Sequence, residues 1–333
     1  MSKNGHKGGS MRSLSGAPLY AVLALGALGT VSSTIGCGRV GVLTAQKAYK
    51  DANQAYQQQD YKKASELYEQ AVADNPDLDQ AYFFLGNSYD NMWKPSKKGE
   101  AANDALLTKA VANYEKCAEK CTPSADPVVK KLGPLSLQYL VQAYSPDRLN
   151  DPAKAESVVI RMIQIDPSDA DNYFALANIY EQAGLYDDAE RVYLRAKDAK
   201  PSEAAVYMQL AGYYTRQGDF DKAIQAFEER AAKEPTNPEA FYTIGTQYYD
   251  HAFRGSGVKE SDRKESTEKG LAAVNHALEL KPDYTEAMVY KGLLLRLEAN
   301  LEKDTSKQQA LLKEADTLHD KAEAMRKQKA SGQ

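Results

Sequence analysis

The chain has 333 residues, and its hydrophobic content of 43% excludes an intrinsically disordered protein. Its formal net charge at pH 7 is −4, and the first 36 residues hold three of the 42 basic residues and no acids, so the rest carries 39 basic and 46 acidic residues. This mildly acidic balance argues against nucleic acid as the main partner, and its simplest interpretation is a solvated acidic surface.

The N-terminal residues 1–36 are typical of an export signal. Three cations, Lys3, Lys7 and Arg12, precede an uncharged and mostly apolar run at 17–31. The run is too short and too rich in glycine for a membrane-spanning helix, and it suits the hydrophobic region of a signal peptide. Either Met1 or Met11 fits as the first residue of such a signal.

The signal ends in a sequence that resembles the signal box of bacterial lipoproteins. Residues 33–37 read Ser-Thr-Ile-Gly-Cys, with Thr34 where leucine is usual and with Ile35 bulkier than usual. The resemblance implies that residues 1–36 are removed and that the Cys37 thiol takes a diacylglycerol.

The protein would then be exported and held at a membrane by this lipid, facing the periplasm or the cell exterior. A tether is predicted at 37–44. In a bacterium with two membranes the resemblance favours the outer one, because Gly38 is not aspartate. A secreted protein, or one anchored by an uncleaved segment, is the alternative.

One pattern occurs twice between Ala170 and Pro235, with a spacing of 34 residues. Small residues in it allow two helices to approach closely, large residues fill the spaces between them, glycine suits a tight turn, and proline ends a helix. The first copy is Tyr173, Leu176, Ala177, Tyr180, Gly184, Ala189, Tyr193, Ala196 and Pro201, and the second is Tyr207, Leu210, Ala211, Tyr214, Gly218, Ala223, Phe227, Ala231 and Pro235. This period is typical of a helical solenoid.

The pattern resembles the tetratricopeptide repeat (TPR). The resemblance implies an all-α fold, a right-handed superhelical solenoid of antiparallel helix pairs. We predict six or seven repeats over residues 45–325, the last of them a capping pair, and a flexible tail at 326–333.

Two predicted repeats contain insertions between their first helix, A, and their second helix, B, near 91–104 and 251–266. Insertions on one face of a solenoid often mark binding, but they are also tolerated as plain surface loops. Trp93 and Phe253 are candidates for exposed aromatic side chains, and packing onto the repeat beneath is the alternative for both.

In TPR proteins the A helices line a concave groove, so the resemblance places a binding site there. The groove candidates are Tyr49, Phe83, Phe174, Met208 and Tyr242 in one row, and Asn53, Asn87, Asn178, Gly212 and Thr246 in a second row four residues later. Asparagine can bond both groups of a peptide backbone and rings can cover its side chains, so an extended peptide is the expected ligand. The alternative for the aromatic row is packing between neighbouring A helices. Aromatic residues replace the lysines of the carboxylate clamp in chaperone-binding TPRs, so an acidic C-terminal tail is not expected.

No catalytic or metal-binding motif is recognisable. The four histidines are scattered and form no His-Glu-x-x-His set, and neither a phosphate-binding glycine loop nor a nucleophile elbow is present. We therefore expect no enzyme activity, no metal and no cofactor. Cys117 and Cys121 share one face of a predicted helix. They could form a disulfide if the last turn opens before Pro123, and packing of Cys117 is the alternative.

These features together predict a protein–protein interaction scaffold or assembly factor at the bacterial cell envelope. The first alternative is an accessory lipoprotein subunit of a secretion, pilus or outer-membrane assembly machine. A binder of a small molecule or glycan, or an enzyme, is a distant alternative. The sequence does not determine the partner, the pathway or the oligomeric state.

Overall fold

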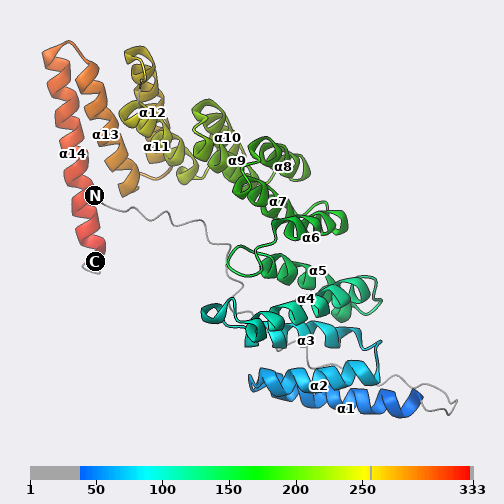
Figure 1. Ribbon diagram of the computed structural model, residues 1–333. Helices are drawn as coiled ribbons and strands as arrows, with labels where there is room; N and C mark the ends of the chain where they lie inside the picture. Colours follow the sequence, from blue (N-terminus) through cyan, green and yellow to red (C-terminus); the bar gives the residue numbers. More distant parts are fainter. Residues whose placement is uncertain (1–37, 256, 331–333) are drawn as a thin grey trace. The chain divides into compact units, whose positions relative to one another are not determined.

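The structure, a computed structural model, describes residues 38–255 and 257–330 (Figure 1). These residues form α-helices, one short 3₁₀ helix and the connections between them, with no strand in the described ranges. The all-α prediction is confirmed. The helices group into two compact units, residues 1–165 and 166–333. The predicted signal at 1–36 and the lipidation site Cys37 lie outside the described residues.

The first unit contains three helix pairs, drawn in blue to green in Figure 1. Its helices are α1 (Gly38–Gln57), α2 (Tyr61–Asp74), α3 (Asp79–Met92), α4 (Ala101–Cys121), α5 (Pro127–Ala143) and α6 (Pro152–Ile165), and the 3₁₀ helix η2 (Pro95–Lys97) lies between α3 and α4. Helix α1 packs on α2, α3 on α4 and α5 on α6, so each pair forms one repeat.

The second unit contains four further pairs, drawn in green to red. Its helices are α7 (Ala170–Gln182), α8 (Tyr186–Ala199), α9 (Ala204–Gln217), α10 (Phe220–Lys233), α11 (Pro238–Arg254), α12 (Glu260–Leu280), α13 (Thr285–Leu301) and α14 (Thr305–Ala330). Each odd-numbered helix packs on the even-numbered helix that follows it.

Local signals in the sequence set the helix boundaries. The Asp219 carboxylate accepts a hydrogen bond from the backbone N–H of Lys222 at the start of α10. Gly218, directly before it, has a φ of 75°, the left-handed conformation that glycine adopts without strain. Gly184 has the same conformation one repeat earlier, with a φ of 74°. The turn between helices A and B is therefore encoded locally.

The repeat pattern forms the core, as its chemistry predicts. In the first copy six of the nine pattern residues are buried, namely Tyr173, Leu176, Ala177, Ala189, Tyr193 and Ala196. The first tyrosine of a repeat also bonds the proline that closes the repeat before it. Tyr207 donates its hydroxyl proton to the carbonyl of Pro201 at 2.7 Å, and Tyr173 bonds Pro167 in the same way at 3.0 Å. This hydrogen bond ties successive repeats together.

Three boundaries differ from the sequence prediction. Helix α1 begins at Gly38, so most of the predicted tether at 37–44 is helical. The predicted tail is helical up to Ala330, because α14 runs on without a breaking residue. Much of the first insertion forms η2 and an early start of α4 at Ala101. No helix in the described part of the chain is long and apolar enough to cross a membrane.

Candidate functional site

The predicted groove is closed in the first unit. Phe83 is 0% exposed and Asn87 is 3% exposed, both on α3. The Phe83 ring packs against the ring of Tyr114 at 5.9 Å and that of Tyr139 at 5.6 Å, centroid to centroid. The prediction that Phe83 and Asn87 line a groove is wrong, because rings from α4 and α5 cover them.

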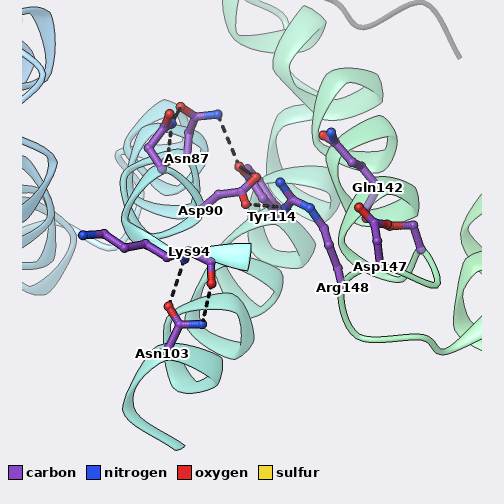
Figure 2. A network of polar contacts seen from close by, with 10 residues as sticks. Asn87, Asp90, Lys94, Asn103, Tyr114, Gln142, Asp147 and Arg148 are labelled. Carbon is purple, nitrogen blue, oxygen red and sulfur yellow. Dashed lines mark hydrogen bonds and ion pairs between the residues drawn. The ribbon is translucent and has the colours of Figure 1, made fainter. Parts of the chain in front are cut away.

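The Asn87 amide is satisfied inside the protein (Figure 2). Its oxygen accepts hydrogen bonds from the Tyr56 hydroxyl at 2.5 Å and from the Asn91 amide at 2.8 Å. Its Nδ2 donates to the Tyr114 hydroxyl at 3.3 Å. Burial raises the pKa of Tyr114 well above its usual value, and the nearby Asp90 carboxylate adds to this. The buried asparagine therefore makes three of its four possible hydrogen bonds inside the core, and at 3% exposure it does not face a peptide.

Arg148 links the first insertion to this core. Arg148, in the α5–α6 connection, places its guanidinium 2.5 Å from the Asp90 carboxylate. The same guanidinium lies over the Trp93 ring, 5.1 Å from its centroid. The Asn103 side chain bonds both the N–H and the carbonyl of Lys94, as Figure 2 shows. Trp93 is 6% exposed, so it packs inward and presents no surface for a partner.

The remaining candidates of the first unit are also engaged. The Asn53 amide oxygen accepts a hydrogen bond from the Tyr68 hydroxyl at 2.6 Å. Tyr49 is half-buried against the Tyr68 ring at 5.8 Å, and burial raises its pKa to about 12. Tyr49 and Asn53 therefore take part in packing between helices.

Cys117 and Cys121 are both buried and are free thiols in the structure, with their sulfur atoms 2.6 Å apart. Helix α4 continues through Cys121, so the opening of its last turn that a disulfide needs is not seen. The hydrogen bond from Cys121 lowers the pKa of Cys117, and the same contact raises that of Cys121. The disulfide stays a prediction.

In the second unit the same row is more open. Phe174, Asn178, Tyr242 and Thr246 are half-buried, as is Gly212, and Met208 is 39% exposed. The Met208 sulfur lies 3.0 Å from a guanidinium nitrogen of Arg230 on α10. Phe174 packs on Tyr193 at 6.2 Å. Phe174 thereby ends a row of rings that continues through Tyr193 and Tyr213 to Tyr214, and the hydroxyls of these three tyrosines are bonded within the chain. Tyr242 belongs to a second row, whose tyrosine hydroxyls are not bonded within the described part of the chain.

Tyr242 is part of a continuous row of five rings, which we call the aromatic ladder. Its other members are Tyr249 and Phe253 on α11, Tyr284 directly before α13, and Tyr290 on α13. Neighbouring ring centroids lie 5.1 Å apart for Tyr284 and Tyr242, 5.4 Å for Tyr242 and Tyr290, 5.5 Å for Tyr290 and Tyr249, and 5.4 Å for Tyr249 and Phe253. The ladder thus spans two neighbouring A helices.

The ladder reaches the surface most clearly at Phe253. Tyr249 belongs to a buried cluster with Val274 and Leu294, and Tyr290 packs against that cluster. The Lys281 ammonium lies over the Tyr284 ring, 4.9 Å from its centroid. Phe253 is 57% exposed, Tyr249 is 9% exposed, and the other three rings are half-buried. The four tyrosine hydroxyls have no hydrogen-bond partner among the described residues, and none of them is enclosed away from solvent. By contrast, the hydroxyls of the core tyrosines Tyr68, Tyr173, Tyr207 and Tyr214 are all bonded within the chain. The ladder therefore offers the exposed Phe253 ring together with tyrosine hydroxyls that have no partner in the described part of the chain.

The hydroxyls of Tyr242, Tyr249 and Tyr284 remain protonated at neutral pH. Burial raises the pKa of Tyr242 to about 12, and the neighbouring Tyr290 and Tyr284 contribute in the same direction. Burial also raises the pKa of Tyr249 and Tyr284. Each can donate a hydrogen bond to a carbonyl.

No metal-binding group is found in the described ranges, where no cluster of three or more His, Cys, Asp or Glu side chains could hold an ion. The ladder consists of one phenylalanine and four tyrosine side chains.

Comparison with known proteins gives the family. The tetratricopeptide repeat family matches this sequence at residues 49–91, 140–204 and 174–238. A solved structure of the C-terminal part of a TPR repeat-containing protein from Cytophaga hutchinsonii is similar, with a TM-score of 0.51 and 14% identity over 83% of this chain and 98% of that one. The chain therefore contains tetratricopeptide repeats, at residues 49–91 and 140–238.

Other solved TPR proteins are less similar. The MamA protein has 18% identity over 60% of this chain and 94% of its own, with a TM-score of 0.41. YrrB, described as a TPR protein with an unusual peptide-binding site, has 16% identity over 64% of this chain and 97% of its own, with a TM-score of 0.38. No curated protein matches the sequence.

Most of the aromatic ladder was not predicted from the sequence. Only two of its members were named, Tyr242 as a groove residue and Phe253 as a candidate exposed ring. A signal was present, because Tyr242, Tyr249 and Phe253 are spaced by seven and four residues and so share one face of α11. Tyr284 and Tyr290 belong to the loosest repeat, and their place beside α11 is visible only in the structure.

Proposed function

We propose that this TPR protein is a non-catalytic interaction scaffold that binds an extended peptide, or a partner protein through such a segment, on the aromatic ladder of its second unit. The observation that carries the proposal is the row of five rings with four unpartnered tyrosine hydroxyls. Rings cover apolar side chains and hydroxyls bond a peptide backbone, so the two together suit a peptide.

We further propose that the scaffold works at the bacterial cell envelope, held there by a lipid on Cys37. The support is the lipoprotein-like sequence at 33–37 and the apolar run before it. Helix α1 begins at Gly38, so a lipid on Cys37 would attach directly to the first helix.

Site-specific photo-crosslinking tests the binding surface. A photoreactive phenylalanine analogue in place of Phe253 should form adducts in cells that disappear when Tyr242, Tyr249 and Tyr290 are all changed to Phe. The matched control position is Tyr186, which is 49% exposed in the same unit and outside the ladder. The same adducts from positions 253 and 186, or adducts that persist in the triple variant, would contradict the proposal.

Intact mass of the membrane-fraction protein tests the location. We expect a chain that begins at Cys37 and carries diacylglycerol, and accumulation of the precursor when the lipoprotein signal peptidase is inhibited. A soluble product that begins at Met1 or Met11 would overturn the envelope proposal and leave the ladder proposal standing.

A further inference from the structure

Helix α1 carries exposed apolar side chains in its second turn. Leu43 is 72% exposed and Val42 is 45% exposed. Gly41 faces α2, since a Cβ added there would lie 3.0 Å from the carbonyl oxygen of Asp74. Successive residues turn by about 100° around a helix, so Leu43 lies about 200° from Gly41 and points away from α2. The described part of the chain leaves this outward side of α1 uncovered.

The same outward side carries positive charge. Lys47 and Lys50 are exposed, and at about 100° per residue they lie within about 40° of Leu43 around the helix. Residues 38–50 contain three basic residues and no acid, and Asp51 is the only acidic residue of α1. Residues 37–333 as a whole carry more acids than bases, so this half of the helix differs from the rest of the chain.

The acids at this end of the first unit lie behind α1. Asp77 and Asp79 each pair with Lys120, at 3.2 Å and 3.5 Å. Asp74 is the last residue of α2, the helix that Gly41 faces. The outward side of the first half of α1 is therefore apolar and basic, whereas the acids are on the opposite side.

The proposed lipid would hold this side close to a membrane. Leu43 lies about 7.5 Å along the helix axis from Gly38, at 1.5 Å per residue, and Cys37 is one peptide bond further. The headgroup region of one leaflet is roughly 5–7 Å thick. An exposed side chain this close to the lipid lies at or near the headgroups whatever the tilt of α1.

A bilayer suits these groups better than a second copy of the chain does. Apolar side chains flanked by lysines are typical of a helix that lies on an anionic membrane, with its cations at the phosphates. A stable dimer buries about 800 Å² on each copy, which two partly exposed side chains do not supply. The same side continues with the exposed Gln54 and Gln57, so the apolar and basic groups are confined to the half of α1 next to the lipid.

We infer that the first half of α1 lies on the surface of an anionic phospholipid bilayer, with Val42 and Leu43 in the headgroup layer and Lys47 and Lys50 at lipid phosphates. This inference rests on the proposed lipid at Cys37 and adds a second contact with the same membrane. The contact orients the first repeat, because α2 packs on the opposite side of α1 and so faces away from the bilayer.

Quenching by brominated lipid tests the inference. The lipidated protein carries a fluorophore on Gln46→Cys, an exposed position near Leu43, while the thiols of Cys117 and Cys121 are buried. In vesicles of phosphatidylethanolamine and brominated phosphatidylglycerol we expect a blue-shifted emission and strong quenching. Label that stays as unquenched as in buffer would overturn the inference.

Variants show whether the outward side causes the quenching. Changing Val42 and Leu43 together to Gln removes the apolar groups, keeps good helix formers and should abolish most of the quenching. Val128→Gln is the matched control and should change nothing, because Val128 is 44% exposed on α5 in the same unit. Quenching that survives in the double Gln variant would overturn the inference, since the lipid alone would then explain it.

The two lysines have a test of their own. Changing Lys47 and Lys50 together to Gln should lower the quenching to the level seen in brominated phosphatidylcholine, since each lysine near an anionic surface changes partition about fivefold. Equal quenching of the unaltered protein in the two kinds of vesicle would overturn the contact with anionic lipid.

Intact mass separates this inference from the envelope proposal. If Cys37 carries no lipid, both are overturned. If it carries the lipid and the label is not quenched, only the inference is overturned. A blue shift that rises with protein concentration in the Cys37→Ser chain without vesicles would show that a second copy covers this side, which would also overturn the inference.

Discussion

The first insertion buries its aromatic residue, and the second exposes it, although both join helix A to helix B of a repeat. Trp93 is 6% exposed and packs with Leu107 and Ala143, whereas Phe253 is 57% exposed and stacks only on Tyr249. The difference lies in what the neighbouring chain supplies. The α5–α6 connection brings Arg148 onto Trp93, and Lys98 of the insertion bonds the carbonyl of Pro146 at 3.1 Å.

The second insertion has a different anchor. His251 stacks on Phe220 with centroids 3.8 Å apart and shares a hydrogen bond of 2.9 Å with Ser266, while Phe253 lies beyond these contacts at the end of α11. An insertion at the same place in the repeat thus stabilises the first unit through Trp93, and in the second unit it leaves Phe253 exposed. Position within a repeat does not by itself decide the role of an insertion.

Truncation of the two aromatic residues should give the largest contrast. Trp93→Ala should lower the free energy of unfolding of the first unit by about 4 kcal/mol, because it leaves a large cavity in the core. Phe253→Ala should change the stability of the second unit by less than about 1 kcal/mol, as expected for an exposed side chain. Urea unfolding followed by circular dichroism measures both. Similar losses of unfolding free energy in the two variants would show that the two insertions do not differ in their contribution to stability.

Removal of Arg148 should have the next largest effect. Arg148→Ala leaves the Asp90 carboxylate buried without its cation and should destabilise the first unit by about 3 kcal/mol. Adding Asp90→Asn should restore part of this loss, since no buried charge then remains. A double-mutant cycle, followed by urea unfolding, measures the coupling energy between Arg148 and Asp90. Strictly additive changes in the free energy of unfolding would show that the two side chains do not stabilise each other.

The second repeat with an insertion also depends on close helix packing. A Cβ added at Gly245 would lie 2.4 Å from Cγ1 of Val274 and 3.2 Å from the carbonyl oxygen of Gly270. Gly245→Ala should therefore cost about 2 kcal/mol through overpacking of α11 on α12.

Gly292→Ala is the matched control for Gly245→Ala, because its nearest neighbour, the Ala315 carbonyl oxygen, is 3.3 Å away. Its contact is less tight, and alanine favours a helix over glycine, so Gly292→Ala should destabilise the protein less than Gly245→Ala does. Thermal unfolding of the two variants compares them, and equal midpoints would refute the packing argument.

Alkaline pH should produce the smallest loss of stability, and the loss should occur in both units. Burial raises the pKa of Tyr49 and Tyr242 to about 12 in the folded protein, whereas an unfolded tyrosine ionises near pH 10. Stability from these groups is therefore complete below about pH 10 and is lost as the pH rises toward 12. At pH 11 the loss should be about 1 kcal/mol for Tyr49, and less for Tyr242 because of solvent screening. Urea midpoints between pH 8 and 11 should fall less in Tyr49→Phe and Tyr242→Phe; unchanged slopes would count against this.

The repeat architecture could be predicted because its signals are local. Tyr173 to Pro201 recurs after 34 residues, and each landmark acts within its own helix pair or the next one. The turns at Gly184 and Gly218 need a positive φ. Glycine adopts this conformation without strain, so its position in the sequence predicts the turn. The ends of α1 and α14 were misjudged, because composition does not show where a helix without a breaking residue stops.

The binding surface could be predicted only in part. Phe83 and Tyr242 occupy the same position of the repeat pattern, yet one is 0% exposed and the other belongs to the ladder. Phe83 is covered by Tyr114, on the second helix of its own repeat, and by Tyr139, on the first helix of the next repeat.

The sequence by itself determined the helix pairs, their turns and the two insertions, because periodic burial and turn residues act over a few residues. Only the tertiary structure decided which side chains remain free. Asn87 bonds Tyr56, Asn91 and Tyr114 inside the core, whereas the ladder tyrosines pack against other rings and leave their hydroxyls unbonded among the described residues. Whether a polar group is free depends on neighbours brought by other helices, and that is a property of packing in space.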